Sequence, residues 1–125
     1  MKASLVGIVD DDASVRESVS SLLRSAGYDC AQFESAEALL GSGRLDALDC
    51  LVLDIQMPGT NGLDLLRSLA ERGHPAPVIV LSSEGAAVRA SAFGQGAVAV
   101  LEKPCSGEVL LAAVQSALRR SCPRS

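Results

Sequence analysis

The sequence predicts a single α/β domain in which a parallel sheet lies between two layers of helices. Five short apolar runs have the length and β-branched character of buried strands, and helical patterns separate them. Three of these runs show no alternation of apolar and polar residues, which is typical of parallel strands that are covered on both faces. Strand and helix alternating five times in 125 residues favour a three-layer sandwich with right-handed crossovers.

Each predicted strand is rich in Val, Leu or Ile, or is bounded by turn residues. The five are Leu5–Val9, Asp29–Phe33, Cys50–Leu53, Val78–Leu81 and Val98–Leu101. We expect the domain to cover residues 1–120, with residues 121–125 as a C-terminal tail or the start of a linker.

Apolar residues at helical spacing follow each strand. The first helix is predicted over Val15–Ala26, with a capping box at Ser14–Glu17 and a stop at Gly27. The later helices are predicted at Ala36–Leu40, at Leu63–Ala70 before Gly73, at Ala87–Phe93 and at Leu110–Leu118.

Composition and charge argue against several classes of function. Aromatic residues make up only 2% of the chain, so a base-stacking platform is not expected and the core must be filled by Leu, Val, Ile and Ala. The net charge of -4 repels nucleic acid. The sequence holds no apolar run near the roughly 20 residues of a membrane span and no signal-peptide pattern at its start, so we expect a cytoplasmic protein without a membrane segment.

The four cysteines form no C-x-x-C pair, and the chain has one histidine. This pattern argues against a zinc site and against a disulfide scaffold. We expect reduced thiols, with Cys30 and Cys50 mostly buried.

Apart from Glu34-Ser35 after the second strand, which we expect at the rim, polar residues follow the other four predicted strands. Because ligands of an open parallel sheet bind beyond the carboxyl ends of its strands, these residues are the candidates for a site. They are Asp10-Asp11-Asp12 after the first strand, Asp54 after the third, Ser82-Ser83 after the fourth and Glu102-Lys103-Pro104 after the fifth.

The types of these residues predict a site for a small anionic group beside a divalent metal. Carboxylates that converge on one edge repel each other unless a cation lies between them, and hard oxygen ligands suit Mg²⁺, which pairs naturally with a phosphoryl group. A lysine can pair with a phosphoryl oxygen, and a serine hydroxyl can donate to another. Each motif alone could be structural, for example a solvated turn at Asp10–Asp12 or a surface loop at Lys103-Pro104. Their joint occurrence favours the functional interpretation.

At these residues the sequence resembles the receiver domain of two-component response regulators, particularly the FixJ-like group. The resemblance covers essentially the whole chain. It is carried by Ile8–Asp12, Glu34–Leu40, Leu51–Gly59, Pro77–Ser82 and Gly96–Pro104.

This resemblance implies a flavodoxin-like (βα)5 fold, with a doubly wound five-stranded parallel sheet in the order 2-1-3-4-5. It also implies a phosphorelay acceptor that is not an enzyme in its own right, although it assists its own phosphorylation and dephosphorylation. Its partners would be a sensor histidine kinase or phosphotransfer protein and a downstream output protein or missing output domain. The resemblance further allows a homodimer through helix four, strand five and helix five on phosphorylation, and it implies no direct binding of nucleic acid by this chain.

The resemblance also implies a role for each matching residue. By it, Asp54 is the phosphoacceptor, Ser82 and Val100 are at the switch positions, and Lys103 is the invariant lysine. The ligands of Mg²⁺ would be Asp10, Asp11, Asp54 and the backbone carbonyl of Gln56, with Asp12 as a bystander. Gln56 and Glu84 are at the positions that tune the lifetime of the acyl phosphate, and the Lys103-Pro104 bond would be cis.

Three departures from the family pattern fall on the output side. Val100 stands where the family usually has Tyr or Phe, so the usual swing of an aromatic ring cannot occur. Cys105 stands where many relatives have Phe, and Ser83-Glu84-Gly85 replaces the Gly-His-Gly of the FixJ-like group. A degenerate receiver that binds a partner constitutively is therefore an alternative, although the intact acidic, serine and lysine positions argue against it. A flavodoxin-like cofactor-binding protein or a hydrolase is a further alternative, but the glycine-rich phosphate loop and the G-x-S-x-G elbow are both missing.

Overall fold

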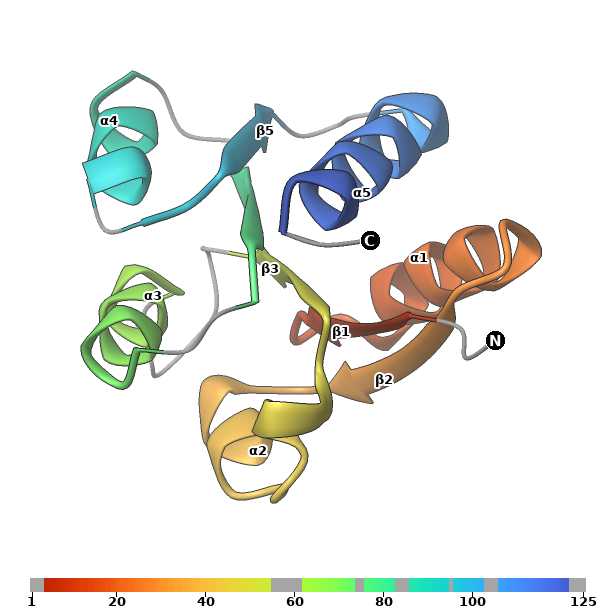
Figure 1. The fold of residues 1–125 in the computed structure, drawn as a ribbon, viewed down its shortest axis with the longest axis horizontal. Helices are drawn as coiled ribbons and strands as arrows, with labels where there is room; N and C mark the ends of the chain where they lie inside the picture. The colour runs from red at the N-terminus through yellow and green to blue at the C-terminus, as the bar shows by residue number, and fades with distance from the viewer. Residues whose placement is uncertain are drawn as a thin grey trace.

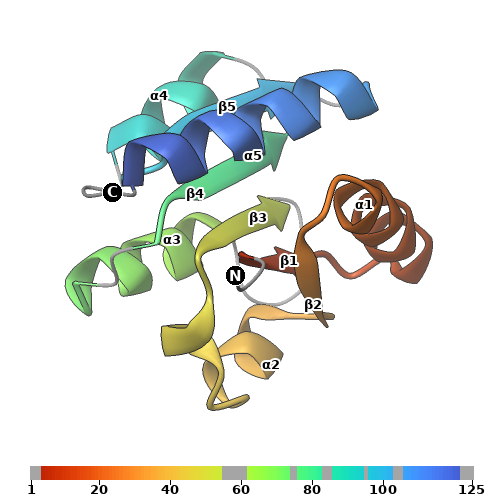
Figure 2. The ribbon, with the colours of Figure 1, turned by 45° about the vertical axis from the view of Figure 1, so that its right-hand side comes forward.

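Five parallel strands form one sheet in the order β2-β1-β3-β4-β5, as predicted (Figures 1 and 2). The computed structural model describes residues 4–54, 62–73, 76–82, 86–94, 96–102 and 106–121. The strands are β1 (Leu5–Val9), β2 (Asp29–Phe33), β3 (Cys50–Asp54), β4 (Val78–Ser82) and β5 (Ala99–Glu102).

The first two strands have the predicted bounds, and the other three extend one residue further towards their carboxyl ends. These strands are longer because the backbone pairing continues to their last residues: Asp54 pairs with Leu81, and Ser82 pairs with Glu102. Backbone pairing therefore carries these polar residues within the sheet. The predicted start of the fifth strand at Val98 was one residue too early.

Helices cover both faces of the sheet. Helices α1 (Ala13–Ser25) and α5 (Gly107–Ser121) lie on one face. Helices α2 (Ala36–Leu40), α3 (Gly62–Glu71) and α4 (Ala86–Gly94) lie on the other (Figure 1). A short 3-10 helix, η1 (Leu45–Ala47), precedes β3 and was not predicted.

The start of α1 differs from the prediction. Asp12, not Ser14, caps the helix, because the Asp12 carboxylate accepts a hydrogen bond from the Ser14 backbone N–H at 2.9 Å. The predicted end is confirmed, since Gly27 follows the helix with φ of 99°, a conformation that favours glycine. Asp12 therefore has a structural role at the start of α1.

Helix α5 continues to Ser121, three residues beyond the last predicted helical residue, Leu118. Residues 122–125 lie outside the described part of the chain. The boundary between domain and tail stays a prediction.

Side chains of alternate strand residues build two apolar clusters, one on each face of the sheet. On β3, Leu51 and Leu53 face α2, α3 and α4, whereas Cys50 and Val52 face α1 and α5. Leu, Val, Ile and Ala fill most of both clusters, as the scarcity of aromatic residues predicted. Phe33 is buried, but Phe93 on α4 is 48% exposed.

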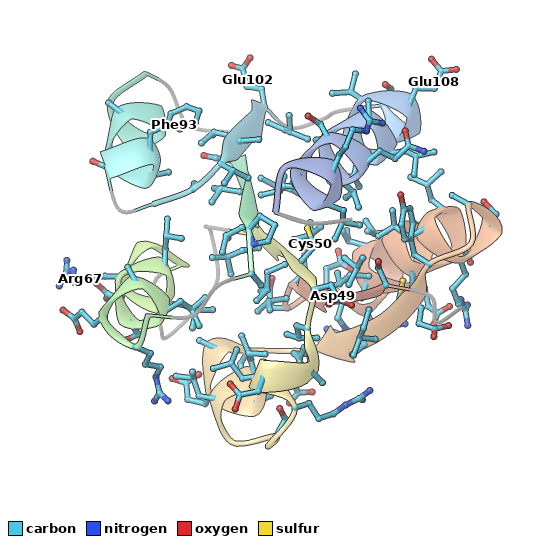
Figure 3. The ribbon with its side chains drawn as sticks, viewed as in Figure 1. Asp49, Cys50, Arg67, Phe93, Glu102 and Glu108 are labelled. Carbon is cyan, nitrogen blue, oxygen red and sulfur yellow. The ribbon has the colours of Figure 1, made fainter. Side chains whose placement is uncertain are left out.

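The two described cysteines are free thiols. Cys50 is fully buried between β3 and the α1/α5 layer (Figure 3), and burial raises the pKa of its thiol to about 12. Cys30 is only half-buried, and desolvation raises the pKa of its thiol as well. The expected burial is thus confirmed for Cys50 and partial for Cys30. Cys105 and Cys122 lie outside the described residues.

Within the part of the chain that the structure describes, no helix has the length and apolar character needed to cross a membrane.

Two neighbouring residues on α5, one buried and one exposed, allow a direct test of how this helix packs on the sheet. Leu110 is 4% exposed and Val109 is 49% exposed. We expect Leu110→Ala to lower the free energy of unfolding by about 2–4 kcal/mol, because it leaves a cavity between α5 and the sheet. Val109→Ala should leave it unchanged or raise it by a few tenths of a kcal/mol, because alanine favours the helix. Urea denaturation followed by far-UV circular dichroism measures both, and equal losses would contradict the packing described.

Candidate functional site

The register of the sheet brings two aspartates to the same edge. Val9 of β1 pairs with Leu53 of β3, so the residues that follow them in the sequence, Asp10 and Asp54, lie level with each other. Both are buried, with 2% and 3% of their surface exposed. Asp11, the next residue, is exposed. The sheet thus holds two carboxylates in the interior and presents a third to solvent.

These three carboxylates form one acidic cluster. One oxygen from each of Asp10, Asp11 and Asp54 lies within 4.8 Å of the other two. Two full charges 4.8 Å apart repel by about 3.5 kcal/mol at an effective dielectric constant of 20, and by less where solvent screens the exposed Asp11. A divalent cation removes this repulsion, and hard carboxylate oxygens with one solvent-facing member match the preference of Mg²⁺ for oxygen ligands and retained water. The donor set therefore fits a magnesium ion.

Four hydrogen bonds fix the turn between β1 and α1. The Asp10 backbone N–H donates to the carbonyl of Phe33 on β2 at 3.2 Å, and the Asp12 N–H donates to Asp10 Oδ1 at 3.0 Å. The third is the bond from Ser14 to Asp12 described above. In the fourth, Arg16 Nη1 donates to the Asp10 carbonyl at 2.6 Å. The acidic turn is therefore held from β2, from its own backbone and from α1.

Sequence reasoning did not single out Arg16 and gave Asp12 no role. The available signal was spacing, because residue i+4 of a helix lies one turn above residue i, and Arg16 is four residues after the capping Asp12.

Comparison with known families agrees with this geometry. The family model of the response regulator receiver domain matches residues 6–115. The chain belongs to this family.

Curated relatives of this receiver domain are transcriptional and response regulators. It is 44% identical over 117 residues to the transcriptional regulatory protein TdiR of Thauera aromatica, covering 93% of this chain and 52% of that protein. It is 41% identical over 119 residues to the response regulator protein TodT of Pseudomonas putida, covering 94% of this chain and 52% of that protein. The chain thus spans about half the length of these relatives.

Solved receiver structures share the fold. FixJ-N superposes with a TM-score of 0.84 at 32% identity, covering 95% of this chain and 96% of that one. The chemotaxis protein CheY4 of Vibrio cholerae superposes with a TM-score of 0.85 at 25% identity, covering 93% of this chain and 99% of that one. The predicted family and fold are both confirmed.

Ser82 and Val100 lie on one face of the receiver's sheet. Val80 pairs with Val100, and Ser82, two residues further along β4, lies on the same side as Val80. Val100 is 8% exposed and packs in the cluster that includes Ala92 of α4. Ser82 is 2% exposed. Val100, which was predicted to be at a switch position, is therefore a small buried side chain.

Three predicted site residues, Gln56, Glu84 and Lys103, lie outside the described residues, as does the Lys103-Pro104 bond. Glu102, the last residue of β5, is exposed and points away from the body of the domain (Figure 3). The structure thus brings together Asp10, Asp11 and Asp54.

A groove lies at the opposite edge of the receiver's sheet, where β1, β2 and β3 begin. Its lining includes Arg24, Asp29, Arg44 and Asp49. The acidic cluster is separate from this groove.

Repulsion within the acidic cluster predicts that neutralising one of its aspartates stabilises the folded domain. Without divalent cations, Asp54→Asn should raise the free energy of unfolding by about 1–3 kcal/mol, because it removes one buried like charge. Saturating Mg²⁺ should stabilise the wild type more than the variant, because a ligand stabilises the state that binds it. Thermal melting with and without Mg²⁺ measures both effects.

The control is Asp64→Asn on α3. The Asp64 carboxylate lies 3.8 Å from Arg67, which points out from α3 away from the sheet (Figure 3), and both side chains are exposed. This exposed pair should contribute less than about 1 kcal/mol, and its loss should leave the effect of Mg²⁺ unchanged. A destabilised Asp54→Asn protein that keeps the full Mg²⁺ effect would contradict the cluster as a cation site.

Proposed function

We propose that this receiver domain takes a phosphoryl group onto Asp54 from the phosphohistidine of a sensor histidine kinase or phosphotransfer protein. The observation that supports the proposal most strongly is the convergence of the Asp10, Asp11 and Asp54 carboxylates within 4.8 Å at the carboxyl edge of the sheet. A nucleophile beside a divalent cation site is the arrangement that phosphoryl transfer requires.

In the proposed reaction, an oxygen of the Asp54 carboxylate attacks phosphorus. An O–P bond forms as the N–P bond to the donor imidazole breaks, and the imidazole leaves with the electron pair of that bond and takes up a proton. Hydrolysis later returns the carboxylate and releases inorganic phosphate. The domain assists both steps by positioning groups and neutralising charge, so we class it as a phosphorelay acceptor and not as a free-standing enzyme.

Mg²⁺, when bound, would neutralise charge on the phosphoryl oxygens and on the acidic cluster. The carboxylates of Asp10 and Asp11, with Asp54 itself and the backbone carbonyl of Gln56, would hold it. Asp10 would supply a buried carboxylate and Asp11 a solvent-exposed one, and Mg²⁺ in proteins usually keeps several waters beside such ligands.

Four side chains complete the proposed site. The Ser82 hydroxyl would donate to a phosphoryl oxygen, and the Lys103 ammonium would pair with another. Gln56 and Glu84 would tune the access of water to the acyl phosphate and hence its lifetime.

The proposed output is a shift of the face formed by α4, β5 and α5. Phosphorylation adds a charge of about -1.5 to -2 beside Ser82, and movement of Ser82 towards it would pull the segment before α4. Val100 lies in the same apolar cluster as Ala92 of α4, so the shift would repack small side chains without the swing of a ring. The shifted face would bind an output partner or a second copy of the domain.

We place the protein in the cytoplasm, where sensor kinases present their phosphohistidine. The curated relatives are about twice as long as this chain, and an output domain in the same polypeptide is one way to deliver the signal. The degenerate alternative, a constitutive interaction module, has less support because the acidic cluster is complete.

The test is phosphorylation by a small phosphodonor in the presence of Mg²⁺. We expect the intact mass of the wild type to increase by one phosphoryl group, and removal of Mg²⁺ with a chelator to abolish the gain. Asp54→Asn should take up no phosphoryl group, because an amide does not form an acyl phosphate.

The matched control is again Asp64→Asn, which should be phosphorylated at the wild-type rate. Peptide mass spectrometry then identifies the modified residue. A phosphoryl group on a residue other than Asp54, or uptake that is independent of Mg²⁺, would refute the proposed function.

A further inference from the structure

We propose that Arg16 is a positioning residue for metal binding, which it supports by fixing the peptide group that joins Asp10 to Asp11. The side chain of Arg16 is half-buried, and its Nη1 donates to the Asp10 carbonyl at 2.6 Å across six residues of sequence. This inference rests on the proposed function, because it concerns the Mg²⁺ that the acidic cluster would hold.

The carbonyl that Arg16 contacts belongs to the peptide between the two proposed ligands. Asp10 follows the last residue of β1, and its N–H is anchored to Phe33 on β2. Rotation of the next peptide would leave Asp10 nearly in place but would swing Asp11. A hydrogen bond to the carbonyl of that peptide opposes the rotation. Arg16 therefore controls the direction from which Asp11 reaches the cluster.

Arg16 is itself held in a rigid frame. Its backbone N–H donates to the carbonyl of Asp12 at 3.0 Å, which is the first hydrogen bond of α1. The next residue, Glu17, accepts a hydrogen bond from Gln32 Nε2 on β2 at 3.0 Å. The first turn of α1 is thus tied to the same strand as Asp10. The guanidinium is therefore delivered by a helix whose first turn is hydrogen-bonded to the strand that also anchors Asp10.

The charge of Arg16 and its hydrogen bond should have opposite effects on the affinity for Mg²⁺. A guanidinium near a cation site opposes cation binding through its field, so its removal by itself should tighten Mg²⁺ binding. Loss of a positioning hydrogen bond should have the opposite effect. Groups that orient metal ligands typically change metal affinity by about 10–100-fold when removed. We therefore expect weaker binding after Arg16 is neutralised, despite the more negative site.

The experiment measures Mg²⁺ binding to the unphosphorylated domain by isothermal titration calorimetry. Arg16→Gln should raise the dissociation constant about tenfold or more. Arg16→Lys keeps the charge and can still donate one hydrogen bond, so it should remain within about threefold of wild type. The matched control is Arg24→Gln, because Arg24 is an exposed arginine in the last turn of the same helix and its loss removes the same charge.

The rate of phosphorylation by a small phosphodonor gives a second measure. For Arg16→Gln, half-saturation by Mg²⁺ should shift upward by the same factor, whereas the rate at saturating Mg²⁺ should stay within about threefold of wild type. A merely structural role would instead lower the melting temperature without Mg²⁺ and reduce the rate at every Mg²⁺ concentration.

Unchanged or tighter Mg²⁺ binding by a folded Arg16→Gln protein would overturn the inference, as would equal weakening by Arg24→Gln. Far-UV circular dichroism establishes folding, and if Arg16→Gln does not fold, the comparison is made with Arg16→Met at the same position. Failure of the wild type to bind Mg²⁺ or to be phosphorylated would refute the proposed function. This result is distinguishable from failure of the inference about Arg16, because it is seen in the wild type alone.

Discussion

The register between β1 and β3 is the constraint on which the site depends. Pairing of Val9 with Leu53 sets Asp10 level with Asp54, and burial of both leaves little freedom for either carboxylate. A slip of one residue would move the apolar side chains of β3 to the wrong faces, so the two apolar clusters specify the same register that the acidic cluster needs. The fold and the site thus share one physical determinant.

Much of this arrangement could be predicted from the sequence, because it depends on local patterns. Uninterrupted apolar runs followed by Asp or Ser indicated buried parallel strands with polar carboxyl ends, and Asp10, Asp11 and Asp54 were found together as predicted. The helix cap was assigned to Ser14, because Ser14 with Glu17 matches a capping box, but Asp12 is the residue that the turn places at the cap. Arg16 was missed for a related reason. Its spacing from Asp12 places it one turn above the cap, but its contact with the Asp10 carbonyl depends on how the turn folds back, which spacing alone does not determine.

The apolar cluster that packs under α4 includes Val100, which was predicted to be at a switch position. Val100 is buried beside Val80 and packs with Ala92, so the cluster under α4 is built there from small side chains. The large side chain of Phe93 on α4 is exposed and is not among the residues of this cluster.

We propose the cation site at the carboxyl edge of the sheet, and not at another acidic part of the surface. Paramagnetic broadening of amide resonances by Mn²⁺, which shares the preference of Mg²⁺ for oxygen ligands, tests it most directly. We predict that substoichiometric Mn²⁺ first broadens the amide resonances of Asp10, Asp11 and Asp54. The amide resonances of Asp29 and Asp49, in the groove at the opposite edge of the sheet, should stay sharp. Broadening that starts at Asp29 and Asp49, or that is equal at both edges, would contradict it.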